Sequence, residues 1–354
     1  MNYKFLFISA LLFQCLGCIN VEMAQDSSVP TFIKGADLSF VPEALSANVI
    51  YKYNNELCDP IKLLKQKGGN YIRVRLWHSP TNSHSSFEEV RELSKRIRAA
   101  EMNLWLTVHY SDTWADPGHQ QIPQAWANLS FQQLKIEMAN YTRQIMREIK
   151  PDIIQIGNEI NSGFLHPHGH LIQQEAQCLD LIKTAITVVN NERRATKVML
   201  HFAGIDGANW FFNKMTGLNF DLIGLSYYPI WHGQNLNLLN QTITQLGQQH
   251  QKPVILAETS YPFTLGWNDW TNNVVGLNEH LIPAYPATPQ GQKDYMLALK
   301  NLISSNIHAK GFCYWGGEWT AFRGPQATNG SSWENQAFWD FSNNALPILD
   351  VYED

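Results

Sequence analysis

Short apolar runs bounded by turn-forming residues recur along this chain from residue 31 onward. Their length and their Val, Ile, Leu and aromatic content favour β-strands. The runs predict eight strands, at residues 31–39, 71–77, 103–111, 152–159, 196–204, 222–229, 253–260 and 309–317. No Gly/Ser-rich or highly charged linker interrupts the series, so residues 31–354 are expected to form a single catalytic domain.

Segments with helical periodicity separate most of these strands. Residues 86–102 and 130–150 each begin with a serine that suits an N-cap and continue with acidic or amide residues, and residues 174–193 share the same period. Strands that alternate with helices pair in parallel. Eight such units fit a closed (β/α)8 barrel, the TIM-barrel fold of the α/β class, better than an open sheet.

A barrel of this kind carries its chemistry at the C-terminal ends of its strands. Polar and aromatic residues gather at those ends in this sequence and are sparse at the opposite ends. The candidates are Arg73, Arg75, His109, Asp112, Trp114, Asn158, Glu159, Tyr227, Tyr228, Glu258, Trp315 and Trp319.

Two of these candidates are glutamates on strands that face each other across an eight-stranded barrel. Glu159 ends the fourth predicted strand and Glu258 lies near the end of the seventh. Such a pair suits glycoside hydrolysis, in which one carboxyl group protonates the leaving oxygen and the other attacks the anomeric carbon or activates water. Each glutamate alone also fits a salt-bridged strand cap. Two at facing strands, with Asn158 directly before one, favour a catalytic pair.

Composition changes this picture in one respect, the class of partner. The chain has 354 residues, of which 44% are hydrophobic and 16% charged, and its net charge is -5. With no run of Lys and Arg, nucleic acid is not an expected partner. The 12 Trp, 13 Tyr and 17 Phe residues suit both a large core and stacking against sugar faces, which favours a polysaccharide.

Motifs spread over residues 32–352 resemble glycoside hydrolase family 53, the endo-β-1,4-galactanases of the retaining (β/α)8-barrel clan. They are GADLS (35–39), NYIRVRLW (70–77), HYSDTWADPGHQ (109–120), IPQAW (122–126), QIGNEINSG (155–163), DLIGLSYYPIWHG (221–233), AETSYPFT (257–264), GFCYWGGEW (311–319) and SWENQAFWDFSNNALPIL (332–349). The resemblance implies endo-hydrolysis of β-1,4-D-galactosidic linkages in the (arabino)galactan side chains of pectin.

The resemblance also implies roles for the two glutamates. Glu159 is the expected acid/base and Glu258 the expected nucleophile of a retaining double displacement, with carboxyl groups about 5 to 5.5 Å apart. Glu159 must start protonated, which burial against Trp or Tyr favours, and Glu258 must stay ionised. Arg73 or Arg75, alternate residues on one strand face, is expected to lower the pKa of Glu258.

Neighbouring residues are expected to bind the sugar or support the pair. Tyr227 or Tyr228 is expected to hydrogen-bond Glu258. Asn158 is expected to reach the sugar 2-hydroxyl, and His109 to position groups at the mouth rather than to bind a metal.

The remaining candidates are three tryptophans and two aspartates. Trp315 is expected to form the floor of the subsite where the bond is cut. Trp114 and Trp319 fit either sugar stacking or loop packing. Asp112 and Asp116 fit either sugar binding or loop capping, and the Pro-Gly that follows Asp116 favours capping there.

No metal or cofactor is expected. Some bacterial relatives in this family bind calcium in the loop after the seventh strand, whereas here that loop, residues 264–276, has Asp269 as its only carboxylate. Calcium prefers several charged oxygens. The cysteines beyond residue 18, which are Cys58, Cys178 and Cys313, show no metal-ligand spacing.

The N-terminus reads as an export signal over residues 1–18, with Lys4 ahead of the apolar run 5–13. Two interpretations stay open: a lipoprotein signal with Cys18 as the lipidated first residue, or ordinary cleavage. Residues 19–30 would then form a tether. The protein is expected to be bacterial and exported, and either secreted or held at the cell surface or in the periplasm. It is expected to contact the membrane only through a lipid on Cys18 and to be a monomer.

Two other functions remain open at this stage. Another retaining endo-β-1,4-glycanase, such as a mannanase or a xylanase, would use the same carboxyl pair. A non-catalytic surface protein that binds galactan would use the aromatic residues alone, although the presence of both Glu159 and Glu258 argues against a decayed site.

Overall fold

The computed structural model describes residues 32–354. The export signal predicted over residues 1–18, with Cys18, and the tether predicted over residues 19–30 lie outside the described residues and stay predictions. In the part of the chain that the structure describes, no helix is long and apolar enough to cross a membrane.

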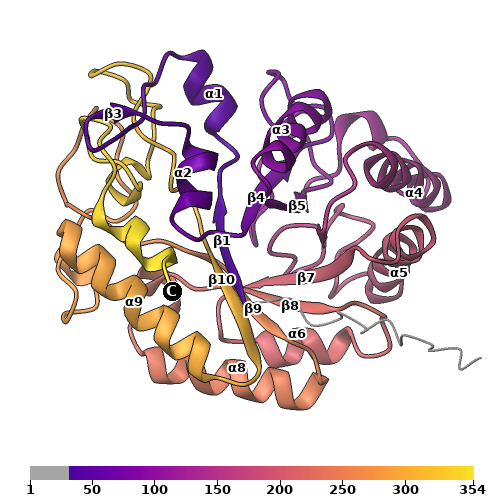
Figure 1. The fold of residues 1–354 in the computed structure, drawn as a ribbon. Coiled ribbons are helices and arrows are strands. Elements are labelled where there is room, and N and C mark those ends of the chain that lie inside the picture. Colours follow the sequence, from indigo (N-terminus) through magenta and orange to yellow (C-terminus); the bar gives the residue numbers. More distant parts are fainter. Residues whose placement is uncertain (1–31) are drawn as a thin grey trace, which may run out of the picture. The chain divides into compact units, whose positions relative to one another are not determined.

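Eight parallel strands close into a barrel, as the sequence predicted, and form a single domain (Figure 1). Around the barrel they run in the order β1-β4-β5-β6-β7-β8-β9-β10 and back to β1. The strands are β1 Ile33–Asp37, β4 Tyr71–Leu76, β5 Asn103–Val108, β6 Ile153–Ile156, β7 Lys197–Ala203, β8 Leu222–Ser226, β9 Val254–Thr259 and β10 Ala309–Tyr314.

Helices surround the barrel on its outside (Figure 1). They are α1 Val41–Ser46, α2 Pro60–Gln66, α3 Phe87–Ala99, α4 Phe131–Glu148, α5 Glu175–Glu192, α6 Ala208–Lys214, α7 Pro229–His232, α8 Leu236–His250 and α9 Pro289–Ser305. The three helices predicted from periodicity are confirmed as α3, α4 and α5. Ser86 and Ser130 cap the first two, and Ser130 forms a capping box with Gln133.

The barrel interior and the layer between strands and helices are both apolar. Interior positions are filled by a cluster that includes Trp105, Met199 and Ile255, all fully buried. A larger cluster joins the outer faces of the strands to the helices. This double burial is why the strands read as near-continuous apolar runs.

One element falls outside the repeating pattern. A short antiparallel hairpin, β2 Lys52–Tyr53 and β3 Glu56–Leu57, lies between α1 and α2. Its strands are too short to carry a readable alternation, so the sequence did not predict it.

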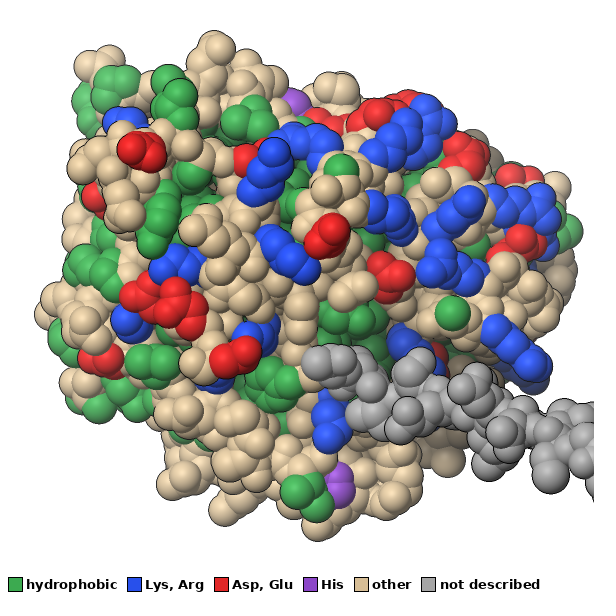
Figure 2. Space-filling model, viewed as in Figure 1, with side chains coloured by type: hydrophobic (Ala, Val, Ile, Leu, Met, Phe, Trp, Pro, Cys, Tyr) green, Lys and Arg blue, Asp and Glu red, His purple; other side chains and the backbone are tan. Residues whose placement is uncertain are grey.

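Charged side chains of both signs are mixed over the face in Figure 2. Ion pairs join surface elements, for example Arg147 with Glu192. Exposed pairs of this kind each contribute little to stability.

Candidate active site

A cavity of about 360 Å³ opens at the C-terminal ends of the strands. Ten of the twelve predicted residues line it, namely Arg73, Arg75, His109, Trp114, Asn158, Glu159, Tyr228, Glu258, Trp315 and Trp319. Six further residues also line it: Asp116, for which sugar binding and loop capping were both open, and Ala115, Trp231, Val274, Ser332 and Trp333, which were not predicted as ligands. The barrel rule therefore located the site and most of its lining.

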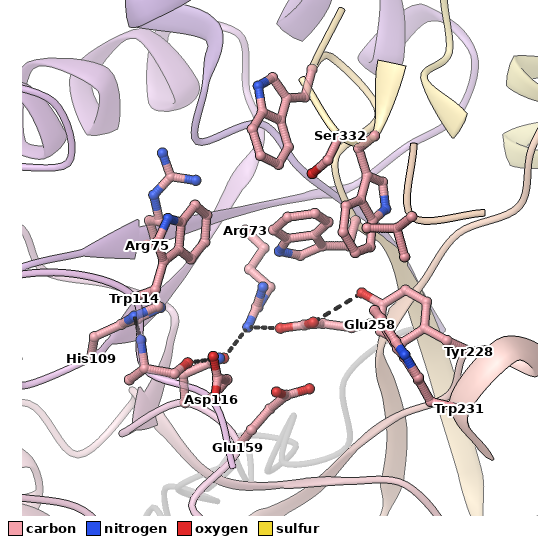
Figure 3. A pocket seen from close by; sticks show the side chains of 16 residues that line it. Arg73, Arg75, His109, Trp114, Asp116, Glu159, Tyr228, Trp231, Glu258 and Ser332 are labelled. Carbon is pink, nitrogen blue, oxygen red and sulfur yellow. Dashed lines mark hydrogen bonds and ion pairs between the residues drawn. The ribbon is translucent and has the colours of Figure 1, made fainter. Parts of the chain in front are cut away.

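Two carboxyl groups face each other in this cavity (Figure 3). Glu159 follows β6 and Glu258 lies in β9, and both are buried, with 9% and 6% of their surface exposed. A carboxyl oxygen of Glu159 lies within 4.8 Å of one of Glu258. Two carboxyl groups so close and so poorly solvated cannot both ionise readily.

Arg73 links the pair to the rest of the barrel. Its Nη2–H groups donate to Glu258 Oε1 at 2.7 Å and to Asn158 Oδ1 at 2.8 Å. Its Nη1–H donates to Asp37 Oδ2 at 2.8 Å. One buried guanidinium thereby neutralises Glu258 and orients the amide next to Glu159.

Tyr228 holds the other oxygen of Glu258. Its hydroxyl donates to Oε2 at 3.0 Å, and burial raises the pKa of this tyrosine well above its usual range, so it remains a neutral donor. Tyr227 does not take part, which corrects the expectation of a site role for both tyrosines. Its side chain points to the other side of the chain and its hydroxyl donates to the carbonyl of Gly233.

The two glutamates differ in their tendency to ionise. Burial, with the nearby charge of Glu258, raises the pKa of Glu159 to about 8. Burial also raises the pKa of Glu258, but the charge of Arg73 and the hydrogen bonds from Tyr228 and Arg73 oppose that rise. Arg73 therefore acts in the predicted direction without outweighing burial. The contacts of Glu258 with Arg73 and Tyr228 thus favour ionisation of Glu258 over ionisation of Glu159.

The backbone at Glu159 is itself unusual. Its φ of 47° lies in the left-handed region, directly after Gly157 with φ of 74° and Asn158. A non-glycine residue in this region costs on the order of 1–3 kcal/mol. The turn that ends β6 uses this conformation to direct the carboxyl group of Glu159 into the cavity.

Two buried polar residues behind Glu159 were not predicted. Ser226, the last residue of β8, donates its hydroxyl to Glu159 Oε1 at 2.5 Å. His201, within β7, lies 2.9 Å from the same hydroxyl through Nε2. Both lie in predicted strands, at 196–204 and 222–229, and neither was among the candidates.

Asn158 and His109 complete the polar lining. Asn158 Oδ1 accepts a hydrogen bond from Arg73, and one amide N–H of Asn158 donates to the carbonyl of Ala115. The second amide N–H is left for a ligand. His109 Nδ1 accepts the indole N–H of Trp77 and the backbone N–H of Ala115. Burial lowers the pKa of His109 well below its usual range, so the ring is neutral and carries its hydrogen on Nε2.

Arg75 does not contact Glu258, so of the two arginines only Arg73 fills the expected role. Arg75 Nε–H donates to Ser85 Oγ, and its guanidinium lies 3.9 Å from the ring of Phe40 and 4.4 Å from that of Trp114. This stacking fixes one wall of the cavity.

Tryptophans form the remaining walls. Trp315 contacts Trp333 edge-on, with ring centroids 4.7 Å apart, and Trp114 lies 6.0 Å from Trp315. Trp319 lies parallel to Trp333 at 6.3 Å and stacks on the ring of Phe40 at 4.0 Å. Both Trp114 and Trp319 thus line the cavity and pack against the loops.

The two aspartates behave differently from each other. Asp112 lies outside the cavity, since its carboxylate accepts the backbone N–H groups of Ser79 and Gln124, and the predicted sugar contact is corrected to loop capping. Asp116 caps Gly118 as predicted and also lines the cavity.

The described residues contain one group with the spacing of metal ligands, Glu159, His201 and Glu258. Arg73 already neutralises Glu258 at 2.7 Å, and His201 bonds Ser226, so this set is arranged for proton chemistry rather than for a cation. Asp269 uses Oδ1 to accept the backbone N–H of Thr271. That its loop binds no metal stays a prediction.

The comparison with protein families decides where this site belongs. The family described as "Glycosyl hydrolase family 53" matches residues 33–352, nearly the whole described chain. The chain belongs to glycosyl hydrolase family 53. The resemblance inferred from the sequence motifs is thereby confirmed.

Individual relatives of family 53 agree with this assignment. An arabinogalactan endo-beta-1,4-galactanase of Cellvibrio japonicus is 35% identical, over 99% of this chain and 96% of its own length. An endo-beta-1,4-galactanase of Bacillus subtilis is 30% identical over 91% and 85%. The solved family 53 catalytic domain of Ignisphaera aggregans superposes with a TM-score of 0.86 at 32% identity, covering 92% of this chain and 97% of that one.

Proposed function

We propose that this protein hydrolyses internal β-1,4-D-galactosidic linkages of galactan, including (arabino)galactan side chains of pectin, with retention of anomeric configuration. The observation that carries the proposal is a pair of carboxyl oxygens within 4.8 Å of each other, one on Glu258, which Arg73 holds, and the other on Glu159. Retaining glycosidases hold their carboxyl groups about 5–5.5 Å apart, and inverting ones about 6.5–9.5 Å. The names of the family 53 relatives support the galactan substrate.

In the first step the ionised Glu258 attacks the anomeric carbon while Glu159 gives its proton to the leaving oxygen. The bond from C1 to the leaving oxygen breaks as the bond from C1 to a Glu258 oxygen forms. Arg73 and Tyr228, each bonded to one oxygen of Glu258, orient the carboxylate for in-line attack.

In the second step water hydrolyses the galactosyl ester. Esterification removes the charge of Glu258, and that charge is one cause of the raised pKa of Glu159. Glu159 is then ionised more readily and takes a proton from the attacking water. The free N–H of Asn158 is placed to bind the sugar 2-hydroxyl, and the tryptophan walls supply the apolar faces against which sugar rings stack.

A mannanase or xylanase would use the same two steps, and a galactan-binding protein without activity would use neither. The intact pair, with opposite protonation of Glu159 and Glu258, supports an enzyme over a binder. The family 53 relatives support galactan over mannan and xylan.

Product analysis tests the proposal directly. Purified protein incubated with linear β-1,4-galactan, mannan, xylan and cellulose is expected to release reducing oligosaccharides from galactan alone, in a range of lengths that marks internal cleavage. Proton NMR within minutes of mixing is expected to show the β-anomer as first product. Release from mannan or xylan instead would overturn the substrate, and a first-formed α-anomer would overturn retention.

Tyr228 offers a further test, with a matched control next to it in the chain. Tyr228→Phe removes a hydrogen bond that stabilises the ionised form of Glu258, so its pKa rises and the acidic limb of kcat/KM moves up by about one pH unit. Tyr227→Phe loses a hydroxyl bonded to a backbone carbonyl outside the site and is expected to leave that limb in place. A pH–rate profile in which both variants move alike would contradict this role.

A further inference from the structure

A buried chain of hydrogen bonds runs from the barrel interior to the candidate acid. It connects Trp105, Gln155, His201, Ser226 and Glu159, which come from or adjoin four consecutive strands, β5 to β8. The first four of these side chains are fully buried. Water therefore does not compete for their hydrogen bonds.

The direction of the chain is set at Trp105. An indole N–H can only donate, so the amide atom of Gln155 that lies 3.2 Å from Trp105 Nε1 is the oxygen. The other amide atom is then the nitrogen, which lies 2.8 Å from His201 Nδ1. The orientation of the Gln155 amide thus follows from the indole N–H of Trp105, which can act only as a donor.

His201 consequently has one possible neutral form. Two of the three polar atoms around its Nδ1 are donors, the Gln155 amide at 2.8 Å and the backbone N–H of Glu159 at 3.3 Å. The third, Asn158 Oδ1 at 3.3 Å, already accepts from Arg73, so the shorter contact with the Gln155 amide decides that Nδ1 carries no hydrogen. Burial, with the charge of Arg73, holds the pKa of His201 well below its usual range and keeps the ring neutral. Its hydrogen is on Nε2 and is donated to Ser226 Oγ at 2.9 Å.

The Ser226 hydroxyl then has only Glu159 to donate to. Its oxygen already accepts from His201, and its hydrogen points to Glu159 Oε1 at 2.5 Å. Because Oε1 accepts this hydrogen, it does not also carry the acid proton of Glu159. No other described residue forms a hydrogen bond to Oε2, and the side chain lines the cavity.

We infer that Ser226, oriented by His201, is a positioning residue that places the acid proton of Glu159 on Oε2, the oxygen that faces the leaving group. The inference rests on the proposed glycosidase function. As Oε2–H transfers its proton to the glycosidic oxygen and the C1–O bond breaks, the remaining carboxylate keeps the Ser226 hydrogen bond. That bond is stronger to a carboxylate than to a neutral acid, so it contributes mainly at the transition state.

Other charged groups near Glu159 stay in place when Ser226 is changed. Glu258 and Asp116 raise the pKa of Glu159 and Arg73 lowers it, while His201 is neutral. Ser226 is the one hydroxyl among these influences, and its hydrogen bond lowers the pKa of Glu159. Ser226→Ala therefore raises that pKa and moves the basic limb of kcat/KM to higher pH, by about one unit.

The expected kinetic signature of Ser226→Ala depends on the leaving group. For galactan, whose leaving alkoxide needs a proton, kcat/KM falls by about 10-fold. For a 2,4-dinitrophenyl β-galactobioside, whose phenolate leaves without one, kcat/KM changes less than about two-fold. The matched control is Thr196→Val. Thr196 lies directly before β7, at the opposite end of the barrel, and its buried hydroxyl donates to the carbonyl of Pro151. Loss of this hydroxyl is expected to change neither value of kcat/KM.

Equal losses of kcat/KM on both substrates, with an unmoved basic limb, would reduce Ser226 to a structural residue and overturn the inference. A second measurement does not depend on folding of a variant or on activity. Histidine-selective 15N NMR of the wild-type protein is expected to show His201 as the Nε2–H tautomer without titration between pH 5 and 8. An Nδ1–H tautomer would contradict the proposed order of donors and acceptors between Trp105 and Glu159. Failure to cleave galactan would instead contradict the proposed function and would leave the tautomer result valid.

Discussion

Glu258→Ala is expected to lower galactan hydrolysis by on the order of 10⁴-fold or more, because it removes the group that forms the covalent intermediate. The loss is expected in kcat/KM, and binding of galacto-oligosaccharides should survive because the tryptophan walls and Asn158 are untouched. Thermal unfolding is expected to change less than activity, since Arg73 keeps its bonds to Asp37 and Asn158.

Azide makes this test specific to a nucleophile. The truncated side chain leaves space beside C1, and azide in that space attacks an activated aryl β-galactobioside to give an α-galactosyl azide, detectable by NMR. Glu334→Gln, which alters a buried carboxyl group outside the cavity, serves as control and is expected to turn over like wild type. Full turnover by Glu258→Ala, or rescue that yields the β-azide, would contradict the assignment.

Glu159→Gln is expected to lower kcat/KM on galactan by about 10²- to 10⁴-fold, the usual contribution of general acid catalysis. The glutamine keeps an oxygen to accept the Ser226 hydrogen, so the change removes the proton without disturbing its surroundings. With a 2,4-dinitrophenyl leaving group kcat/KM is expected to stay near the wild-type value, and the basic limb of the pH profile is expected to disappear.

The same variant should trap the intermediate. Without its base the second step slows, so intact-protein mass spectrometry with the activated substrate is expected to show a galactosyl adduct on Glu258. A galactan loss matched by an equal loss of kcat/KM on the activated substrate would mean that Glu159 does something other than donate a proton.

The fold was predictable because parallel barrel strands are covered on both faces and so stand out as apolar runs between capped amphipathic helices. The hairpin β2–β3 was not, because two-residue strands carry no period. The polar site residues were predictable for a related reason: a strand that is apolar along most of its length makes a polar residue at its end conspicuous.

The errors and omissions have physical causes as well. Tyr227 and Tyr228 are adjacent in sequence but point to opposite sides, and nothing in the pattern says which side faces the mouth. Trp333 and Ser332 come from a long loop whose path depends on tertiary packing. His201 and Ser226 were hidden among core residues, and the signal that could have found them is the cost of burying a polar side chain without a partner.

Arg73 lies in β4, and its hydrogen bonds connect three other parts of the barrel. They reach β1 through Asp37, β9 through Glu258 and the turn after β6 through Asn158. Contacts between residues so far apart in sequence require the closure of long loops, which costs conformational entropy. In a chain whose barrel has not closed, Glu258 lacks the guanidinium of Arg73, which favours its ionised form. Closure of the barrel therefore also assembles the catalytic centre, so that the same ion pair serves the fold and the proposed nucleophile.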